Sequence, residues 1–308
     1  MKILSLKRRL RAGLASLLAL MVMGIGAVVM VYPYVYMVGG SLKTRSEFAT
    51  DRPAILPPRF EPSRLFQRFV VGRKDPDYDQ QLKEWPLQRN YADAITFGHI
   101  DRFVCNSFLY AFVITAISLV VNVMAAYAFA RMRFPGRDLL FGMLLMTMMI
   151  PSTVLLIPQF LLIQRLGLVD HPLGVVLPAF ADAFGIFLLR QFFISIPTDL
   201  ESAARVDGCS RGGILRHVIV PLSKPVLITL GLFTFMAAWN AFEWPLVVLS
   251  NQDLYPLTVG LALFRDQNTQ DWPRVFAASV LGSVPLIALF YAAQRYLVSG
   301  ITLSGIKG

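Results

Sequence analysis

The sequence predicts an all-α integral membrane protein with six membrane-spanning helices, and three observations carry that prediction. Hydrophobic residues make up 56% of the 308 residues, charged residues make up 16%, and the mean hydropathy is +0.58. Soluble domains have about 45–50% apolar and about 25% charged residues, so a soluble enzyme, a disordered chain and a disulfide scaffold are excluded. The apolar residues form six long runs, and the basic residues cluster between particular runs.

Each run has about the length of a membrane crossing, because a helix needs about 20 apolar residues to span roughly 30 Å of hydrocarbon. The first run, Ala12–Val38, is longer than the apolar core of a cleaved signal peptide, so we expect a retained anchor helix. The fourth run is short and contains Asp182. In chain order, the second to sixth runs are Phe103–Ala130, Leu139–Ile163, Leu173–Leu189, Val226–Leu249 and Val275–Val298. Prolines inside the runs predict kinked helices at Pro151, Pro158, Pro178 and Pro285.

The distribution of lysine and arginine predicts the orientation, since short loops rich in these residues stay in the cytoplasm. Fifteen of them lie in the N-terminus, residues 131–138, residues 190–225 and the chain from Arg295 onward. The opposite short loops hold three, Arg165, Arg265 and Arg274. Both termini are therefore predicted to be cytoplasmic. The long segment 39–102 is predicted to be an extracytoplasmic cap.

The sequence lacks the motifs of several other classes of protein. It has no Gly-x-x-x-x-Gly-Lys-Ser/Thr loop, so the chain is predicted not to hydrolyse nucleotide and not to be an enzyme. The three histidines lie outside the apolar runs, which argues against a Ser/His protease and a histidine metal site. We therefore expect no catalytic or metal-binding residues. The net charge of +10 is attributed to cytoplasmic loops rather than to nucleic acid.

The segment 190–225 is too long for a tight turn and is predicted to contain a short helix. Thr198 and Glu201 have the spacing of a capping box, in which each side chain accepts a hydrogen bond from the other residue's backbone amide. The helix is therefore expected to start near Asp199. Asp207-Gly208 is a typical helix end, with glycine in the left-handed conformation.

One face of this predicted helix carries side chains of falling size. Leu200, Ala204 and Gly208 recur at every fourth position, which lets another surface approach the backbone closely. The physical argument leaves two interpretations open. The helix either lies on anionic lipid or docks on a cytosolic partner.

The segment resembles the cytoplasmic loop of ABC importer permeases, whose signature is Glu-Ala-Ala, three residues, Gly, nine residues and Ile-x-Leu-Pro. Ala203-Ala204, Gly208 and Pro221 stand at the required spacing, with Val218 and Val220 in place of Ile and Leu. The resemblance covers roughly residues 103–308. Its other motifs are similar to those of the maltose-type carbohydrate importers, second permease subunit: Asn106-Ser107, Ala125 to Arg131, Phe134-Pro135-Gly136, Leu166-Gly167-Leu168, Arg190-Gln191-Phe192, Trp239-Asn240, Pro245-Leu246 and Lys307-Gly308.

The resemblance implies a type I ABC importer permease fold in the bacterial inner (plasma) membrane. It implies as partners a second, related permease subunit, two cytosolic ABC ATPase subunits and an extracytoplasmic solute-binding protein. ATP and Mg²⁺ would bind on the ATPases, with no cofactor on this chain. The loop helix would sit in a cleft of an ATPase and carry its closure to the membrane helices. Carried over by position, the residues of this coupling loop are Glu201, Ser202, Ala203, Ala204, Asp207, Gly208 and Pro221.

One position departs from the signature. Ser202 stands where the signature has glutamate, and Glu201 lies one residue earlier, which is about 100° of rotation on a helix. Glu201 either substitutes for the signature glutamate or only caps the helix, and both interpretations stay open.

The fifth run offers candidates for contact with cargo. Trp239, Asn240 and Glu243 are spaced by three or four residues, which places them on one helical face, and aromatic with polar groups suits a sugar. The alternative is packing between helices with an interfacial aromatic belt. Asp182 and Glu243 are expected to face a cavity or a partner, because an unpaired charge at the bilayer centre costs about 2.5–3.5 kcal/mol.

The expected function is a permease subunit that forms half of the pathway of an ATP-driven importer for a sugar or oligosaccharide. A polyol or glycerol phosphate is the alternative cargo, and an ion-driven secondary transporter is the alternative class. The predicted organisation is a cytoplasmic N-terminus with the first span (1–38), the cap (39–102), a five-helix core (103–298) containing the coupling loop (190–225), and a cytoplasmic tail (299–308).

Overall fold

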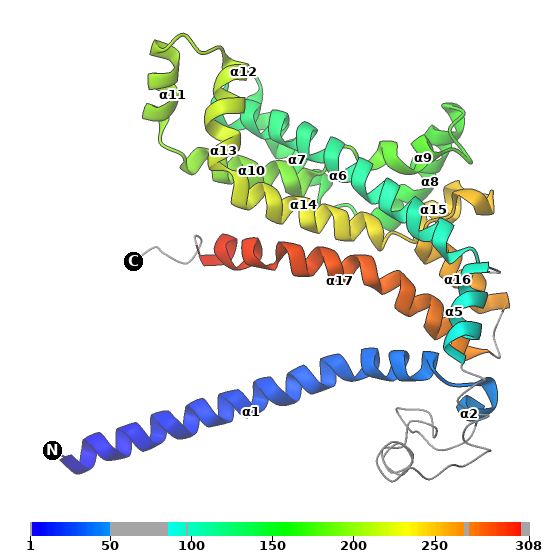
Figure 1. Cartoon of the computed structure of the whole chain (residues 1–308). Helices are drawn as coiled ribbons and strands as arrows, with labels where there is room; N and C mark the ends of the chain where they lie inside the picture. Colours follow the sequence, from blue (N-terminus) through cyan, green and yellow to red (C-terminus); the bar gives the residue numbers. More distant parts are fainter. Residues whose placement is uncertain (1, 50–85, 97, 268–270, 303–308) are drawn as a thin grey trace. The chain divides into compact units, whose positions relative to one another are not determined.

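The computed structural model describes residues 2–49, 86–96, 98–267 and 271–302, and the regular structure among these residues is helical (Figure 1). The chain forms two compact units: residues 1–98 with 264–281, and residues 99–263 with 282–308. More than half of the predicted cap at 39–102 and the terminal Lys307-Gly308 lie outside the described residues. The predicted domain boundaries stay predictions.

Three helices in the described part of the chain are long and apolar enough to cross a membrane alone. They are α1 (Lys2–Ser41), α6 (Ile100–Arg131) and α17 (Trp272–Thr302). They correspond to the predicted first, second and sixth runs. Most apolar side chains of α1 from Leu17 to Val35 are exposed, as a lipid-facing surface requires.

Three further apolar segments are pairs of helices bent at a short break. α7 (Arg137–Thr147) and α8 (Ser152–Arg165) meet at 104°. Pro172–Ala179 meets α10 (Ala183–Ser195) at 40°, and Arg211–Leu222 meets α14 (Lys224–Trp239) at 82°. Counting each pair as one crossing gives up to six, which is the predicted number. The number of crossings and the cytoplasmic side of the termini stay predictions.

Two of the four prolines predicted to kink helices lie at or beside these breaks. Proline lacks an amide hydrogen, and its ring clashes with the carbonyl four residues earlier in a helix. Pro151 directly precedes α8, and Pro178 lies in the 3₁₀ turn η2 (Leu177–Ala179) before the break at α10. By contrast, α8 and α17 continue through Pro158 and Pro285. The first two prolines therefore end helices, whereas the other two are accommodated inside them.

The first unit joins the end of α1 to two short helices, α2 (Arg45–Ala49) and α5 (Pro86–Thr96), and to the start of α17. Asn90 on α5 is buried and donates its amide to the carbonyls of Ser41 (2.8 Å) and Lys43 (2.9 Å). These bonds satisfy carbonyls at the end of α1 that have no helical partner. Arg274 at the start of α17 pairs with Asp93 of α5 at 2.8 Å.

The second unit is built around α6, which packs along α10 and α14. Figure 1 shows α11 and α12 at one end of these helices and α8, α9 and α15 toward the other. The short elements of this part of the chain are α9 (Pro172–Val176), η2, α11 (Thr198–Val206), α12 (Arg211–Ile214), the π-helical turn η3 (Leu215–Ile219), α13 (Val220–Leu222), α15 (Glu243–Val248), the 3₁₀ turn η4 (Gln252–Leu254) and α16 (Leu257–Gln267).

Two apolar clusters fill the second unit along α6. One joins Tyr127 of α6 to Phe193 of α10 and Ala204 of α11. The other joins Tyr110 of α6 to Val175 of α9 and to the end of α15. The first cluster therefore supports α11, and the second supports the ends of α9 and α15.

Asp170 ties the loop between α8 and α9 to the chain after α15. Its Oδ1 accepts hydrogen bonds from the amides of Asn251 (2.8 Å) and Ser250 (2.9 Å), and its own amide donates to the Val248 carbonyl (2.8 Å). These bonds from Asn251 and Ser250 hold the pKa of Asp170 below its usual value, because they favour the ionised carboxylate. Asp170 has a left-handed backbone with φ of 58°, which aspartate tolerates.

Candidate functional site

The short helix predicted to start near Asp199 is present as α11, and one of its faces packs against its own chain. Glu201 is buried, and Ala204 is 8% exposed within the cluster that contains Ile214 and Ile219. Val206, by contrast, is 89% exposed. α11 therefore has an inner face that belongs to the fold and an outer face open to a partner.

The three residues of the predicted small-side-chain face, Leu200, Ala204 and Gly208, do not have the same environment. Leu200 and Gly208 are exposed, but Ala204 between them is covered by residues of α12 and η3. The surface that approaches the backbone at Ala204 is therefore part of the same chain. The small side chain lets α11 lie close to its own chain.

Glu201 does not cap α11, because its carboxylate is bound elsewhere. Oε1 lies 2.9 Å from Nε of Arg131, the last residue of α6, and the two side chains are 5% and 9% exposed. Oε2 lies 3.6 Å from Nη2 of Arg205, whose side chain is 60% exposed. α11 follows Pro197 and begins without a side-chain cap. The predicted capping box is therefore wrong: the Glu201 carboxylate lies against Arg131 and not against the Thr198 amide.

Ser202 and Glu201 point in different directions. Ser202 is exposed, and its hydroxyl donates to the Thr198 carbonyl one turn back at 3.2 Å. Glu201 is directed inward, as the rotation of about 100° between adjacent helical residues requires. Glu201 and Ser202 therefore occupy different faces of α11, and whether Glu201 replaces the signature glutamate stays open.

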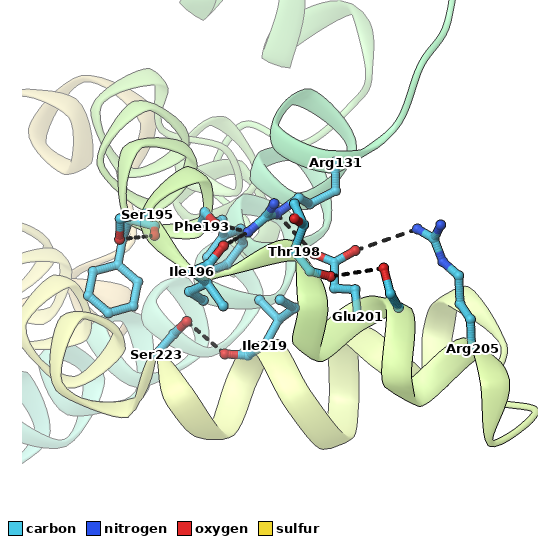
Figure 2. A network of polar contacts seen from close by, with 11 residues as sticks. Arg131, Phe193, Ser195, Ile196, Thr198, Glu201, Arg205, Ile219 and Ser223 are labelled. Carbon is cyan, nitrogen blue, oxygen red and sulfur yellow. Dashed lines mark hydrogen bonds and ion pairs between the residues drawn. The ribbon is translucent and has the colours of Figure 1, made fainter.

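Arg131 joins three elements (Figure 2). Besides pairing with Glu201, its Nη2 donates to the Phe193 carbonyl at 2.5 Å and to the Ile196 carbonyl, at the C-terminal end of α10. The last carbonyls of α6 and α10 carry the negative ends of two helix dipoles, which favours a guanidinium there. Glu201 lies in the first turn of α11, where the dipole favours a carboxylate. The positive charge of Arg131 is therefore favourable at the C-terminal ends of α6 and α10, and the negative charge of Glu201 is favourable at the N-terminal end of α11.

α11 ends as predicted. Gly208 has φ of 79°, and its amide donates to the Arg205 carbonyl at 3.0 Å. A Cβ added at Gly208 would meet open space. The chain then turns at Ser210, which caps α12, and reaches α13 through η3. Of the predicted coupling-loop residues, Glu201 and Ala204 point inward, and those exposed are Ser202, Ala203, Asp207, Gly208 and Pro221.

A basic groove flanks α11. It has a volume of about 950 Å³ and runs between the chain after α6 and the segment from α11 to α12. Its arginines are Arg131, Arg133, Arg137, Arg205 and Arg211, and Glu201 is the one acidic residue among those that line it. The lining of this groove therefore has a net positive charge.

A cavity of about 520 Å³ lies in the second unit, bounded by α6, α9, α14 and α15. Its wall is mostly apolar, with the hydroxyls of Ser118 and Thr234, the amide of Gln159 and the carboxylate of Asp182 among the polar groups. The indole of Trp244 also lines it, and its Nε1 donates to the Gly174 carbonyl at 3.1 Å. No lysine or arginine is among the lining residues that the structure describes.

Asp182 lines this cavity, as expected of a carboxylate inside an apolar run. It stands at the break before α10 and accepts hydrogen bonds from the amides of Gly185 (2.7 Å) and Phe184 (3.3 Å). Asn122 of α6 is fully buried behind it and accepts from the Asp182 amide at 3.2 Å. The Asn122 amide donates to Ser118 Oγ at 3.0 Å, so a polar chain runs from α10 into α6.

Trp239, Asn240 and Glu243 do not share a helical face. α14 ends at Trp239, and α15 begins at Glu243. One continuous helix is disfavoured here, because the ring of Pro245 would clash with the carbonyl of Ala241 four residues earlier. Trp239 is 2% exposed and stacks on Phe235, so it packs the core of its own chain. Asn240 and Glu243 are exposed and are not among the cavity-lining residues.

Two residues of the site are not evident from motif spacing. Arg131 looks like one of several loop charges, and only its place directly after an apolar run distinguishes it. Asn122 is a polar residue inside an apolar run, which indicates a partner within the bundle. The sequence pattern does not say which partner either residue meets.

Bent apolar helices surround a mostly apolar cavity that carries a few polar groups, and a surface helix is held by a buried ion pair, which is the arrangement expected of a membrane transport subunit. The chain belongs to the family of binding-protein-dependent transport system inner membrane components, whose model matches residues 118–303. It is therefore a multi-pass inner-membrane permease subunit of an ABC importer, as the sequence resemblance predicted.

Known relatives agree with this assignment. The chain is 37% identical over 203 residues to the arabinooligosaccharides transport system permease protein AraQ of Halalkalibacterium halodurans, covering 66% of this chain and 73% of that protein. It is 36% identical to the sulfoquinovosyl glycerol transport system permease protein SmoH of Agrobacterium fabrum, covering 72% and 79%. It is 36% identical to the sn-glycerol-3-phosphate transport system permease protein UgpE of Salmonella typhimurium, covering 64% and 70%.

The fold is also similar to that of a solved transporter. A bacterial ABC transporter involved in the import of the acidic polysaccharide alginate contains a chain that superposes with a TM-score of 0.73 at 26% identity. The match covers 91% of this chain and 95% of that chain. The predicted permease fold is therefore confirmed.

Proposed function

We propose that this chain forms half of the solute pathway of an ATP-driven importer for a sugar or oligosaccharide, and that α11 is the helix on which a cytosolic ATPase acts. The observation that carries the proposal is the two-sided packing of α11. Glu201 and Ala204 hold its inner face to the bundle, whereas Val206 is 89% exposed on its outer face. A helix anchored in this way can transmit force and still offer a surface to a partner.

The proposed partners are a second, related permease chain, two ATPases and an extracytoplasmic solute-binding protein. ATP and Mg²⁺ would bind on the ATPases, and this chain would have no catalytic activity of its own. Residues 190–225 and both termini would lie in the cytoplasm, in agreement with the distribution of lysine and arginine. The basic groove beside α11 supports an ATPase surface with acidic residues.

The cavity supports a neutral polyhydroxyl cargo. Its polar groups are hydroxyls, an amide and one carboxylate, which can exchange hydrogen bonds with sugar hydroxyls, and Trp244 offers an aromatic ring. A phosphate ester would be repelled by Asp182 and would find no lysine or arginine among the described lining residues. Glycerol phosphate is the second candidate cargo because UgpE is named for it. Asn240 and Glu243 stay predicted pathway residues, since both are exposed.

Replacing Gly208 with tryptophan tests the docking role of α11. The matched control is Gly167→Trp, because Gly167 also has a left-handed φ (68° against 79°) and open space around its Cβ position. In the assembled complex reconstituted in vesicles, G208W should lower solute-dependent ATP hydrolysis about ten-fold or more, since a docking loss of about 1.4 kcal/mol has that effect. G167W should leave it near the unmodified rate. Equal activities of the two variants would contradict the docking role.

The cargo is tested with the same vesicles. Binding protein loaded with a neutral oligosaccharide should stimulate ATP hydrolysis and uptake, whereas glycerol 3-phosphate should not. Stimulation by the phosphate ester alone would replace the sugar with the second candidate.

A further inference from the structure

Arg131 is the point at which the membrane helices meet α11. Its backbone ends α6, its guanidinium donates to the Phe193 and Ile196 carbonyls at the end of α10, and its Nε lies 2.9 Å from Glu201 of α11 (Figure 2). Among the described residues, this is the one ion pair that joins α11 to another element. Ala204 on the same face packs in an apolar cluster with Ile214 and Ile219, and its side chain is a single methyl group.

The burial of this pair indicates what it contributes. The side chains of Arg131 and Glu201 are 9% and 5% exposed, so both charges have lost most of their hydration. Buried ion pairs therefore contribute little net stability compared with apolar side chains of similar size. Separating the two side chains would leave a buried charge uncompensated, so the pair resists displacement of one partner without the other.

The two helices held by Arg131 also form the wall of the cavity. α6 carries Ser118, and α10 carries Phe184 and has Asp182 as its N-cap; all three residues line the cavity. Asn122 joins the same two helices behind this wall through its bonds to Ser118 and Asp182. A displacement applied to the C-terminal ends of α6 and α10 therefore reaches the cavity through continuous helices.

We infer that the Arg131–Glu201 pair is the link that passes displacement of α11 to α6 and α10, and that Arg131 is a positioning residue of the transport cycle. The inference rests on the proposed function, in which an ATPase moves α11. Glu201 accordingly acts inward, on its own subunit, rather than as a contact for the ATPase.

The decisive variant replaces both partners with apolar side chains. R131M/E201L leaves no unpaired charge, and it also removes the guanidinium that donates to the Phe193 and Ile196 carbonyls. Because apolar replacement of a buried ion pair is often neutral for stability, the variant should still fold and assemble with the ATPase. Its transport per ATP hydrolysed should nevertheless fall at least five-fold, since coupling between linked sites is typically about 5–150-fold. E201Q, which keeps an acceptor oxygen but removes the charge, should show a smaller loss of the same kind.

Arg190→Gln is the matched control. Arg190 also joins α10 to α6, through a bond from its Nε to the Phe129 carbonyl at 3.3 Å, and its guanidinium lies 4.1 Å from the ring of Phe141. It has no contact with α11 among those described. R190Q should therefore leave transport per ATP within two-fold of the unmodified chain. An assembled R131M/E201L complex with an unchanged ratio would overturn the inference.

A reporter in the cavity separates this inference from the proposed function. Phe184→Cys places a thiol on α10 in the cavity wall, in a background where the exposed Cys105 and Cys209 are replaced by serine. ATP should change the rate of thiol labelling in this complex and should have no effect when R131M/E201L is added. The same ATP response in both complexes would overturn the inference alone. Absence of any ATP response without R131M/E201L, together with failure of the ATPase to copurify, would overturn the proposed function.

Discussion

Gly185 is predicted to be a position where a single methyl group destabilises the wall of the cavity. A Cβ added there would lie 2.5 Å from Nδ2 and 3.2 Å from Cγ of Asn122, whereas ordinary contacts begin at 3.4 Å. Asn122 has no exposed surface and is held by Ser118 and Asp182. It can therefore retreat only by breaking one of these hydrogen bonds.

The expected loss follows from three contributions. Overpacking costs about 1–3 kcal/mol, a broken buried hydrogen bond costs about 1–3 kcal/mol, and alanine recovers about 1 kcal/mol over glycine in a helix. Gly185→Ala should thus lower the free energy of unfolding by about 1–5 kcal/mol. Gly142→Ala is the matched control, because Gly142 lies inside α7 with nothing within 4 Å of its Cβ position. It should be neutral or stabilise by up to about 1 kcal/mol.

Thermal unfolding of the detergent-purified complex measures the difference. In large domains Tm shifts by about 2–4 °C per kcal/mol, so G185A should unfold at least about 2 °C below the unmodified chain. Asn122→Ala removes the obstructing amide, and G185A should then cause little further loss in that background. Equal Tm values for G185A and G142A, or an undiminished G185A effect in the N122A background, would refute the clash with Asn122.

Two further predictions concern the chain around α9 and α15. Because the folded pKa of Asp170 is lowered, its stabilisation is present above the usual aspartate pKa and is lost as pH falls through the folded pKa. The Tm difference between the unmodified chain and D170N should therefore shrink as the pH is lowered from 7 toward 3; a constant difference would contradict this. Trp244→Phe removes the donor to the Gly174 carbonyl and should cost about 1 kcal/mol, whereas Trp272→Phe, at a more exposed ring, should leave Tm unchanged; equal losses would contradict it.

The elements that depend on local pattern were predictable from the sequence. The apolar runs, the helix after Pro197 and its end at Gly208 follow from composition, proline chemistry and glycine conformation, and each is present. Asp182 was expected to face a cavity because it interrupts an apolar run, and it does so. These features depend on residues only a few positions apart.

The positions that depend on distant residues were not predictable. A capping box at Thr198 and Glu201 satisfies local spacing, yet Glu201 turns to Arg131, which lies seventy residues earlier in the chain. Trp239 and Glu243 satisfy helical spacing, yet the helix is interrupted between these two residues, before Pro245. The indole of Trp239 stacks on Phe235. Local spacing cannot reveal a competing partner that only folding brings near.

The sequence by itself determined that this chain is a membrane permease subunit and where its surface helix lies, because hydropathy, charge and glycine conformation act over short distances. The tertiary structure alone decided that Glu201 faces inward and that α6, α10 and α11 are joined at one guanidinium. The physical reason is that a buried charge must be compensated by an opposite charge nearby. Which residue lies close enough to do this depends on how the helices pack and not on the separation in sequence.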